Sequence, residues 1–328
     1  MLNNIKKIAI VRLSALGDIV NSAVVLQFIY QQYPDAKIDW VTEEVFAPLL
    51  KNHPLVDKIH TVNLKKMKKS KKLSELFETI SKLKNLGDYD LVIDMQGLIK
   101  SSLVTRFVGK NTHGFDKNSS REGLSSLFYK TTSSISYDAN VIKRNCFVVS
   151  DALGFEINDE MLLNKEKVFP TTITDATTKQ IAMVIGASWE SKKYPKEKVA
   201  QLCDKLQEEC IIVWGNDTEK DEALWIEAHS KYAKVAPKFS LTELVEFISN
   251  VTLLIGNDTG PTHMAWGQNI PSITLFGPTT SRMIYETPIN KSIKSPSKVD
   301  INKIDKNDFS ISEIEVDKVY KMAEGLLF

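Results

Sequence analysis

The first predicted strand of the chain ends in a turn that carries a carboxylate. Residues 7–12, KIAIVR, are followed by LSALGD, which places Asp18 where the next helix should begin. This turn holds one glycine, whereas the dinucleotide fingerprint needs three, and the charge of Asp18 would repel a phosphate. The sequence therefore predicts that the turn serves something other than pyrophosphate. Two interpretations of Asp18 stay open: a general base that faces a ligand, or an acid stabilised by the dipole of its own helix.

A second chemical signal follows a predicted strand late in the chain, where residues 256–263 read GNDTGPTH. Gly260 is followed by proline, which suits the first turn of a helix. The N–H groups of Gly260, Thr262 and His263 would be free at such a helix start and would bind an anion such as a diphosphate. Asp258 is suited to accept hydrogen bonds from sugar hydroxyls. The alternative is an ordinary helix cap, in which His263 is a packed and hydrogen-bonded side chain.

Two further loops of the same half carry groups suited to a nucleotide. Ser188 and Lys192 lie in GASWESKKYP, residues 186–195, and can reach the same anion, because a lysine is a compact charge suited to phosphate. Glu219 lies in WGNDTEKDE, where its carboxylate can accept hydrogen bonds from the two adjacent hydroxyls of a ribose. The alternatives are a solvated lysine and a surface acid at the start of a helix.

The first half carries polar and basic groups that suit an anionic partner. Gln96 and Lys100 follow the predicted strand DLVIDM, and Arg121 lies further along the same half. The stretch KKMKKSKK, residues 65–72, holds six lysines. It is either a solvated loop or a landing surface for a phosphorylated lipid.

Strand-like apolar runs alternate with amphipathic helical segments, which predicts an α/β fold with parallel sheets. In the first half the expected strands are residues 7–12, 37–42, 59–64 and 90–95, and the expected helices are 72–86, 98–109 and 138–153. A polar stretch at 156–178 is interpreted as a linker. In the second half the expected strands are 181–187, 210–215, 251–258 and 272–278, with helices that start near Pro195, Thr218 and Ser240. A last helix is expected at about 311–326, with a capping box at Ser312 and Glu315.

The composition is that of a globular protein and excludes several other classes. The 328 residues suffice for two domains, with 43% hydrophobic and 25% charged residues. There is no run of about 18 apolar residues and no secretory pattern, so the chain is expected to stay in the cytoplasm. Residues 1–165 hold 23 Lys and Arg against 18 Asp and Glu, whereas residues 166–328 hold 19 against 23, so the first half is expected to face an anion. Cys146, Cys203 and Cys210 lack metal-ligand spacing and are expected to be reduced.

Two doubly wound domains in series predict a ligand site in a cleft between them. Such sheets bind their ligands at the carboxyl ends of the strands, where all the motifs above are expected. The domains are expected at residues 1–160 and 176–328.

With these motifs in order, the chain resembles glycosyltransferase family 9, the ADP-heptose:lipopolysaccharide heptosyltransferases. The resemblance covers nearly the whole chain and rests on SALGD, DWVTEE, DMQGLIKS, HGFDKNSSREGLSSLFY, KKYP, DTGPTH and TLFGPT. The SRE…SLFY stretch is most similar to the type I enzymes, heptosyltransferase I. The resemblance implies a GT-B fold: two Rossmann-like domains that face a cleft, with the acceptor on the first, the nucleotide sugar on the second, and a last helix crossing back to the first domain.

The resemblance also implies roles for the matched positions. Asp18 matches the catalytic base. The implied donor contacts are Ser188, Lys192, Glu219, Asp258, Thr259, Gly260, Thr262 and His263. The implied acceptor contacts are Ser14, Gln96, Lys100, Arg121, Arg144, Lys65, Lys66, Lys68 and Lys69. The chain departs from its relatives at Trp189, where they carry a basic residue, at Asn140, which replaces a histidine, and at Phe239, which replaces a methionine.

The implied reaction is an inverting, metal-independent transfer of L-glycero-D-manno-heptose from ADP-heptose to the Kdo of Kdo-lipid A, in lipopolysaccharide inner-core biosynthesis. The expected partners are this donor, this acceptor and the inner face of the cytoplasmic membrane, to which the enzyme would bind peripherally. No metal, cofactor or nucleic acid is expected. The alternatives are a heptosyltransferase II type or another nucleotide-sugar transfer, a nucleotide-sugar epimerase, and a non-catalytic carbohydrate-binding protein.

Overall fold

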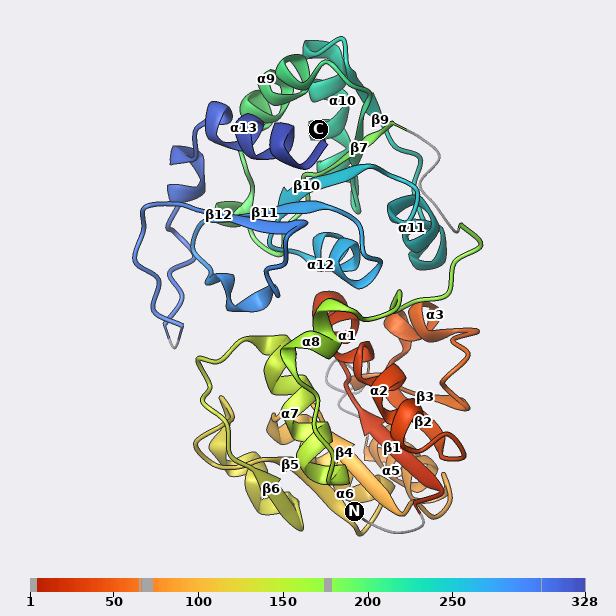
Figure 1. Ribbon diagram of the computed structural model, residues 1–328. Coiled ribbons are helices and arrows are strands. Elements are labelled where there is room, and N and C mark those ends of the chain that lie inside the picture. The colour runs from red at the N-terminus through yellow and green to blue at the C-terminus, as the bar shows by residue number, and fades with distance from the viewer. Residues whose placement is uncertain (1–4, 65, 67–72, 174–178, 302, 328) are drawn as a thin grey trace. The chain divides into compact units, whose positions relative to one another are not determined.

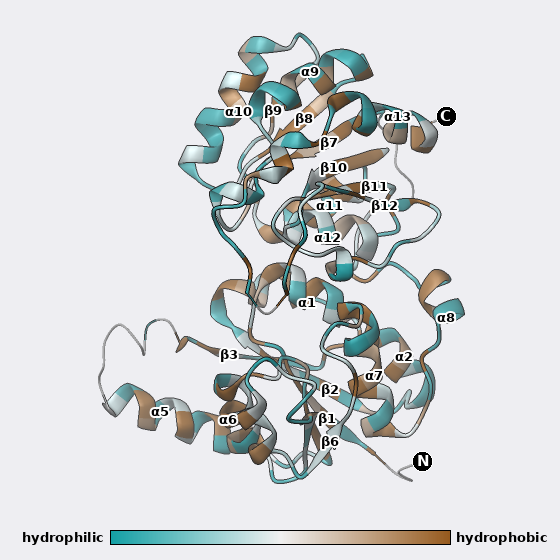
Figure 2. Cartoon of the chain, turned by 90° about the vertical axis from the view of Figure 1, so that its left-hand side faces the viewer, coloured by the Kyte–Doolittle hydropathy of each residue, from teal (hydrophilic) through white to brown (hydrophobic). Residues whose placement is uncertain are grey.

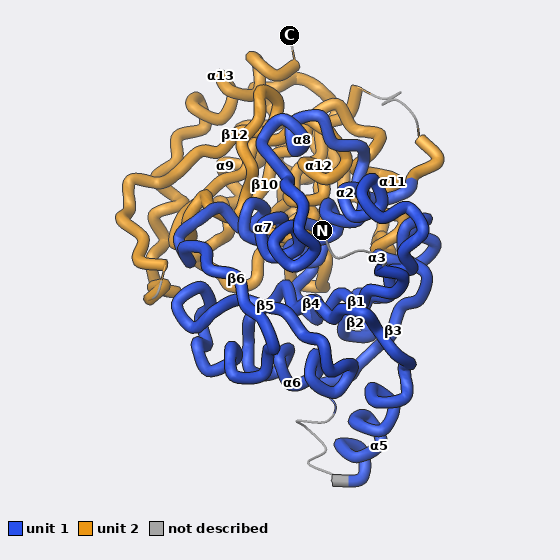
Figure 3. The backbone as a smooth tube through the Cα atoms, turned by 60° about the horizontal axis from the view of Figure 1, so that its bottom comes forward, with its two compact units in different colours: residues 1–170 blue, residues 171–328 orange. Residues whose placement is uncertain are grey.

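The chain forms two compact α/β units. The computed structural model describes residues 5–64, 66, 73–173, 179–301 and 303–327. Contacts between residues divide the chain after Pro170, so that unit 1 ends there and unit 2 begins at Thr171 (Figure 3). Each unit contains one six-stranded parallel sheet.

The sheet of unit 1 has the strand order β3-β2-β1-β4-β5-β6. Its strands are β1 (Lys7–Val11), β2 (Lys37–Glu43), β3 (Lys58–Val62), β4 (Leu91–Asp94), β5 (Thr112–Phe115) and β6 (Thr131–Ser133). Ile8, Ala9, Ile10 and Val11 are fully buried, because both faces of a parallel sheet are covered, and this is why β1 reads as a continuous apolar run. The winding direction reverses beside β1, which pairs with β2 on one side and β4 on the other. Ligands of such sheets bind at this switch point.

Helices and 3₁₀ segments connect the strands of unit 1 (Figure 1). They are α1 (Leu16–Ala23), α2 (Val25–Gln32), η1 (Glu44–Phe46), α3 (Ala47–Leu50), α5 (Leu73–Lys84), α6 (Ile99–Val108), η2 (Gly123–Phe128), α7 (Val141–Leu153) and α8 (Asp159–Leu163). Asn140 is the N-cap of α7, because its side chain accepts hydrogen bonds from the N–H groups of Ile142 and Lys143 at 2.9 and 3.3 Å. This departure from the family pattern therefore serves to start a helix.

The sheet of unit 2 has the order β12-β11-β10-β7-β8-β9. Its strands are β7 (Ile181–Val184), β8 (Cys210–Val213), β9 (Ala233–Val235), β10 (Leu253–Asn257), β11 (Ser272–Phe276) and β12 (Asn290–Lys294). The winding reverses between β7 and β10, which pair side by side. The loops that follow these two strands must therefore start next to each other, although about 70 residues separate them in the sequence.

Helices and 3₁₀ segments also connect the strands of unit 2. They are η3 (Glu190–Lys192), α9 (Lys196–Leu206), α10 (Asp217–His229), α11 (Leu241–Ile248), α12 (Gly260–Gly267), η4 (Ser281–Met283), η5 (Ser310–Glu313) and α13 (Val316–Leu327). The capping box before α11 is confirmed, because Ser240 and Glu243 each accept the backbone N–H of the other. Figure 2 shows the apolar strands of this unit between helices whose outer turns are hydrophilic.

The linker expected at residues 156–178 is partly wrong. Within it, Asn158 caps α8, and Val168 and Phe169 are buried in unit 1. The ring of His53 bonds the carbonyl of Val168 at 2.8 Å and meets Phe169 edge to face. The polar composition hid these anchors, so the first unit extends ten residues beyond the expected boundary at 160.

The C-terminal segment also differs from the expectation. The single helix expected at 311–326 is divided into η5 and α13, and Ser312 donates to the carbonyl of Phe309 instead of capping a helix with Glu315. We expected this helix to cross back to the first domain. Instead, Val316, Val319 and Ala323 join the hydrophobic core of unit 2, where α13 packs on α9.

The remaining composition-based expectations concern cysteines and membranes. Cys146, Cys203 and Cys210 are all free and buried, as expected for reduced thiols. No helix within the described residues has the length and apolar character required to cross a bilayer.

Candidate active site

The loops that follow β7 and β10 are joined at their bases by one side chain. The amide of Asn257 donates to the carbonyl of Ile185 at 2.8 Å and accepts the N–H of Tyr194 at 3.0 Å. Asn257 is the last residue of β10, so it holds the loop after β7 against the point where the next motif begins. The topology thus brings the KKYP and DTGPTH motifs together.

Asp258 is the centre of a buried polar cluster in unit 2. Its Oδ2 accepts hydrogen bonds from Lys192 Nζ and Thr279 Oγ1, both at 2.8 Å, and His263 Nε2 lies 3.3 Å from Oδ1. Each of these four residues is less than 9% exposed. Burial alone would raise the pKa of Asp258, but the hydrogen bond from His263 and the charge of Lys192 outweigh it and hold that pKa far below its usual value. The carboxylate is therefore charged whenever the unit is folded at ordinary pH.

Helix α12 begins directly after this carboxylate. Thr259 is its N-cap, and no side chain caps the first turn. The N–H of His263 donates to the carbonyl of Thr259, so the expectation that this group is free is wrong. Helical geometry leaves the N–H groups of Gly260 and Thr262 without intrahelical partners, and they can bind an anion. The hydroxyl of Thr262 is used internally, since it donates to the carbonyl of Asn257 at 2.7 Å.

Glu219 lies against two glycines at the ends of β7 and β8. Its Oε2 accepts the N–H of Gly215 at 2.7 Å, and its carboxylate fills the space beside Gly186, where a Cβ would come within 2.7 Å of it. The side chain is buried, so it is held in place before any ligand arrives. The interpretation of Glu219 as an ordinary surface acid is therefore wrong.

The loop after β7 presents Ser188 to solvent and turns Trp189 inward. Ser188 is exposed, as a ligand contact requires. The ammonium of Lys192 lies 4.9 Å from the centre of the Trp189 ring, and that of Lys306 lies 5.2 Å from it. Trp189 therefore makes cation–π contacts with both ammonium groups.

In unit 1, Asp18 occupies the third position of α1. One oxygen pairs with the guanidinium of Arg12 at 2.7 Å, and the other accepts the N–H of Ala15 at 3.1 Å. The acid thus supports the first turn of its own helix, as the structural interpretation expected. Its side chain keeps 28% of its surface exposed, so the carboxylate can also meet a ligand. The two interpretations of Asp18 do not exclude each other.

Three of the expected acceptor contacts cluster near the carboxyl ends of β1 and β4. Lys100 donates to Ser14 Oγ at 3.2 Å and lies 3.8 Å from Glu43. Gln96 accepts the N–H of Leu13 at 2.9 Å, so its side chain ties the two strand ends together.

The turn that carries Gln96 is held by a buried acid. Asp94 accepts the N–H groups of Gln96 and Gly97 and the hydroxyl of Tyr129, at 2.7, 3.2 and 2.7 Å. Burial raises the pKa of Asp94 despite these hydrogen bonds. The hydrogen bonds of Asp94, one of them from Tyr129, therefore fix the conformation of this turn.

Arg144 does not lie where the resemblance implied. Its guanidinium is buried and donates to the carbonyls of Ser119, Ile135 and Ser136, with the ring of Phe115 beneath it. These contacts fix the segment between β5 and α7. The expected acceptor contact is therefore corrected to a structural role.

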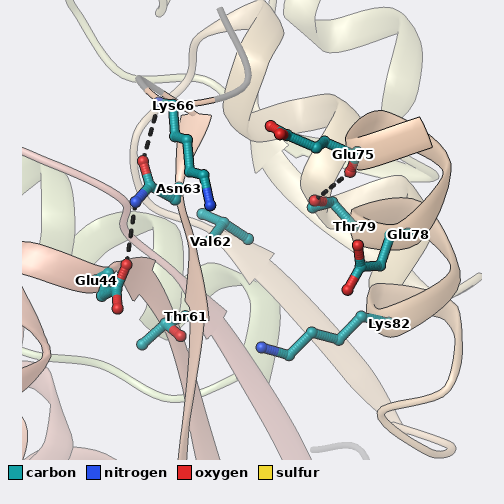
Figure 4. Close-up of a pocket in the computed structure, with 9 residues that line it drawn as sticks. All are labelled: Glu44, Thr61, Val62, Asn63, Lys66, Glu75, Glu78, Thr79 and Lys82. Atoms are coloured by element: carbon teal, nitrogen blue, oxygen red, sulfur yellow. Dashed lines mark hydrogen bonds between the residues drawn. The ribbon is translucent and has the colours of Figure 1, made fainter. Parts of the chain in front are cut away.

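The structure describes only some of the other basic residues that were expected to contact the acceptor. Arg121 is exposed, as expected for a contact residue. Lys65, Lys68 and Lys69 lie outside the described residues. Lys66 lies at a cavity of about 290 Å³ between β3 and α5 (Figure 4). Three glutamates and two lysines line this cavity, so it does not concentrate positive charge.

Comparison with known proteins identifies the chain. Residues 78–310 match the family described as glycosyltransferase family 9 (heptosyltransferase). The chain belongs to glycosyltransferase family 9. It is 41% identical to lipopolysaccharide heptosyltransferase 1 of Campylobacter coli, with 98% of each chain covered, and 28% identical to lipopolysaccharide heptosyltransferase 1 of Escherichia coli K12, with 85% and 90% covered.

Solved structures of heptosyltransferases share the fold. The E. coli heptosyltransferase WaaC with ADP-2-deoxy-2-fluoro heptose matches with a TM-score of 0.80 and 25% identity, over 97% of this chain and 99% of that one. WaaC with ADP matches with a TM-score of 0.78 and 24% identity, over 98% and 99%. The expected GT-B fold of two Rossmann-like units is confirmed, and this family 9 member is a glycosyltransferase.

Four residues of the candidate site were missed by sequence reasoning, although three of them had a signal. Arg12 is a charged residue at the end of an otherwise apolar strand, which indicates a buried partner. Thr279 lies in the TLFGPT motif and Tyr129 in the SLFY stretch, but neither was assigned a role. Asn257 directly precedes Asp258, and nothing in the sequence marks it as the link between two loops.

A substitution at Gly186 tests the position of Glu219 in this family 9 site. In Gly186→Ala the new methyl must displace the Glu219 carboxylate, so we expect ADP to bind roughly tenfold more weakly, the loss of one or two charge-assisted hydrogen bonds. Isothermal titration calorimetry with ADP measures this. Gly325→Ala is the control, since its Cβ position would meet no atom of the described residues within 4 Å beyond its own stretch of helix. Unchanged ADP affinity in Gly186→Ala would remove Glu219 from the nucleotide site.

Proposed function

We propose that this enzyme transfers L-glycero-D-manno-heptose from ADP-heptose to the Kdo of Kdo-lipid A, in assembly of the lipopolysaccharide inner core. Membership of family 9 and the 41% identical heptosyltransferase 1 support the reaction class and the sugar. The observation that carries the proposal is the Asp258 cluster beside the open start of α12, because it combines a fixed acid for sugar hydroxyls with donors for a diphosphate.

Unit 2 would hold the donor. The N–H groups of Gly260 and Thr262 would bind the diphosphate, with Lys192 close by, and Glu219 would accept hydrogen bonds from the ribose hydroxyls. As ADP departs, negative charge grows on its terminal phosphate. Donors already fixed in place stabilise this charge without reorganisation, which lowers the barrier.

Unit 1 would hold the acceptor and supply the base. The Kdo hydroxyl oxygen attacks the anomeric carbon from the side opposite the phosphate, so the configuration inverts. The new carbon–oxygen bond forms as the bond to the phosphate breaks, ADP takes the electron pair, and the Asp18 carboxylate takes the hydroxyl proton. The Arg12 ion pair would hold this carboxylate in one orientation.

The acceptor has a lipid anchor, so the enzyme would work peripherally at the inner face of the cytoplasmic membrane. We also propose that the reaction requires neither metal nor cofactor, since Lys192 and helix N–H groups can serve the diphosphate. Transfer should then persist in a chelator, which is a direct measurement.

Incubation with ADP-heptose and Kdo-lipid A, followed by mass spectrometry, tests the proposal. We expect the addition of one heptose to this acceptor and none to an acceptor that already carries the first heptose. Transfer only to the heptosylated acceptor would indicate a type II enzyme. Conversion of the donor without acceptor would indicate an epimerase, and donor binding without turnover a carbohydrate-binding protein. Each of these three results would overturn the proposal.

A further inference from the structure

The 3₁₀ segment η2 of unit 1 holds two leucines in solvent. Leu124 is 63% exposed and Leu127 is 77% exposed. Side chains three residues apart eclipse one another in a 3₁₀ helix, so these two leucines share one face. Arg121 and Lys130, both exposed, continue the same spacing just outside the two ends of the segment. The result is an apolar pair between two basic residues.

Helix α6 lies against η2 and repeats this composition. The N–H of Ile99 donates to Glu122 at 2.8 Å, which joins the start of the helix to the start of η2. The exposed stripe of α6 is formed by Ile99, Leu103 and Arg106, and the exposed Lys110 follows two residues after the end of the helix. The three positions within the helix follow the helical spacing of one surface stripe. Figure 2 shows α6 beside α5, and the two helices are in contact. Helix α5 carries a further exposed apolar side chain, that of Phe77.

The excess of positive charge is concentrated in the parts of the sequence that contain α5, α6 and η2. Residues 63–84 and 97–130 together hold 14 Lys and Arg against 4 Asp and Glu, whereas the rest of the chain holds 28 against 37. The near-neutral total thus hides a basic region that includes α5, α6 and η2. Anionic lipid attracts such a region, and exposed apolar side chains beside it can enter the boundary between headgroups and acyl chains.

We propose that η2, the exposed stripe of α6 and the adjoining Lys110, which together we name the α6–η2 face, dock on an anionic lipid bilayer. Leu124 and Leu127 enter the interface, and the basic side chains beside them contact the headgroups. The inference rests on the proposed function, in which the acceptor is anchored in a membrane. A second copy of the chain is disfavoured as the occupant, because a symmetric contact would set two basic faces against each other.

Vesicle sedimentation tests the apolar part of the α6–η2 face. The probe is phosphatidylcholine vesicles with and without phosphatidylglycerol, free of acceptor. Wild-type enzyme should bind the anionic vesicles, and L124Q/L127Q should bind at least tenfold more weakly, or about 1.4 kcal/mol. The matched control is Leu224→Gln, which changes an exposed leucine of α10 in unit 2 and should bind as wild type. Melting temperatures confirm that the variants fold.

A charge reversal tests the basic part. R106E/K110E should also bind at least tenfold more weakly, and its residual binding should lose most of its salt dependence. The inference is overturned if wild type ignores anionic vesicles, if L124Q/L127Q binds them as wild type does, or if these leucines prove by ultracentrifugation to hold a dimer together. Transfer to a deacylated, water-soluble Kdo acceptor separates the two proposals. L124Q/L127Q should keep this activity, whereas its absence in wild type that still binds vesicles would overturn the proposed function alone.

Discussion

Replacing Asp18 by asparagine should lower kcat by a factor of about 10² to 10⁴, the usual contribution of a positioned general base. Asparagine keeps the size of the side chain but cannot take the proton of the attacking hydroxyl. The measurement is the initial rate of heptose transfer at saturating donor and acceptor. The KM for ADP-heptose should change little, because the proposed donor contacts all belong to unit 2.

The control for this experiment must separate catalysis from folding. Asp18 pairs with Arg12 and accepts the N–H of Ala15, so its replacement also weakens the start of α1. Melting temperature and circular dichroism of Asp18→Asn measure this loss directly. Asp35→Asn changes an exposed acid of the same unit and should leave the rate unchanged. Turnover within tenfold of wild type, in a folded protein, would remove Asp18 from the base role.

The sheets could be predicted because burial on both faces leaves a simple record in the sequence. A central parallel strand such as β1 has no solvent face, so it reads as an apolar run bounded by turns. The switch points then follow from the order of the strands, and they place the polar ends of β7 and β10 together. For this reason Lys192 and Asp258, which are 66 residues apart, could be assigned to one site from their motifs alone.

Roles that depend on tertiary contacts could not be predicted in the same way. Arg144 and Lys100 have the same charge, and only the packing shows that the first is buried against carbonyl groups while the second stays exposed. The prediction of a linker at residues 156–178 was partly wrong for a related reason. Val168 and Phe169 are too few to form a pattern, yet they anchor the chain to unit 1 because side chains of that unit bury them. Single buried side chains leave no periodic signal.

Replacing Lys192 by alanine should affect both stability and donor binding. The Lys192–Asp258 pair is buried, and removing one partner leaves a charged carboxylate without its cation. Such losses cost about 3 kcal/mol or more in free energy of unfolding, which urea denaturation measures. The affinity for ADP should fall at least tenfold, because a positive charge beside the diphosphate is lost. Lys205→Ala breaks a Lys–Asp pair of similar length on the surface of the same unit and should change neither property appreciably.

The pH dependence of stability supplies a second, independent test of this pair. The pKa of Asp258 in the folded protein lies far below its value of about 3.9 in the unfolded chain. The unfolded state therefore binds a proton more readily, and the stability that the cluster provides is complete above about pH 4 and is lost as the pH falls below it. In Lys192→Ala one of the groups that lowers this pKa is gone, so the difference in stability between wild type and variant should shrink as the solution is acidified. A difference that stays constant from neutral pH into this acid range would show that the lysine acts through packing and not through its charge.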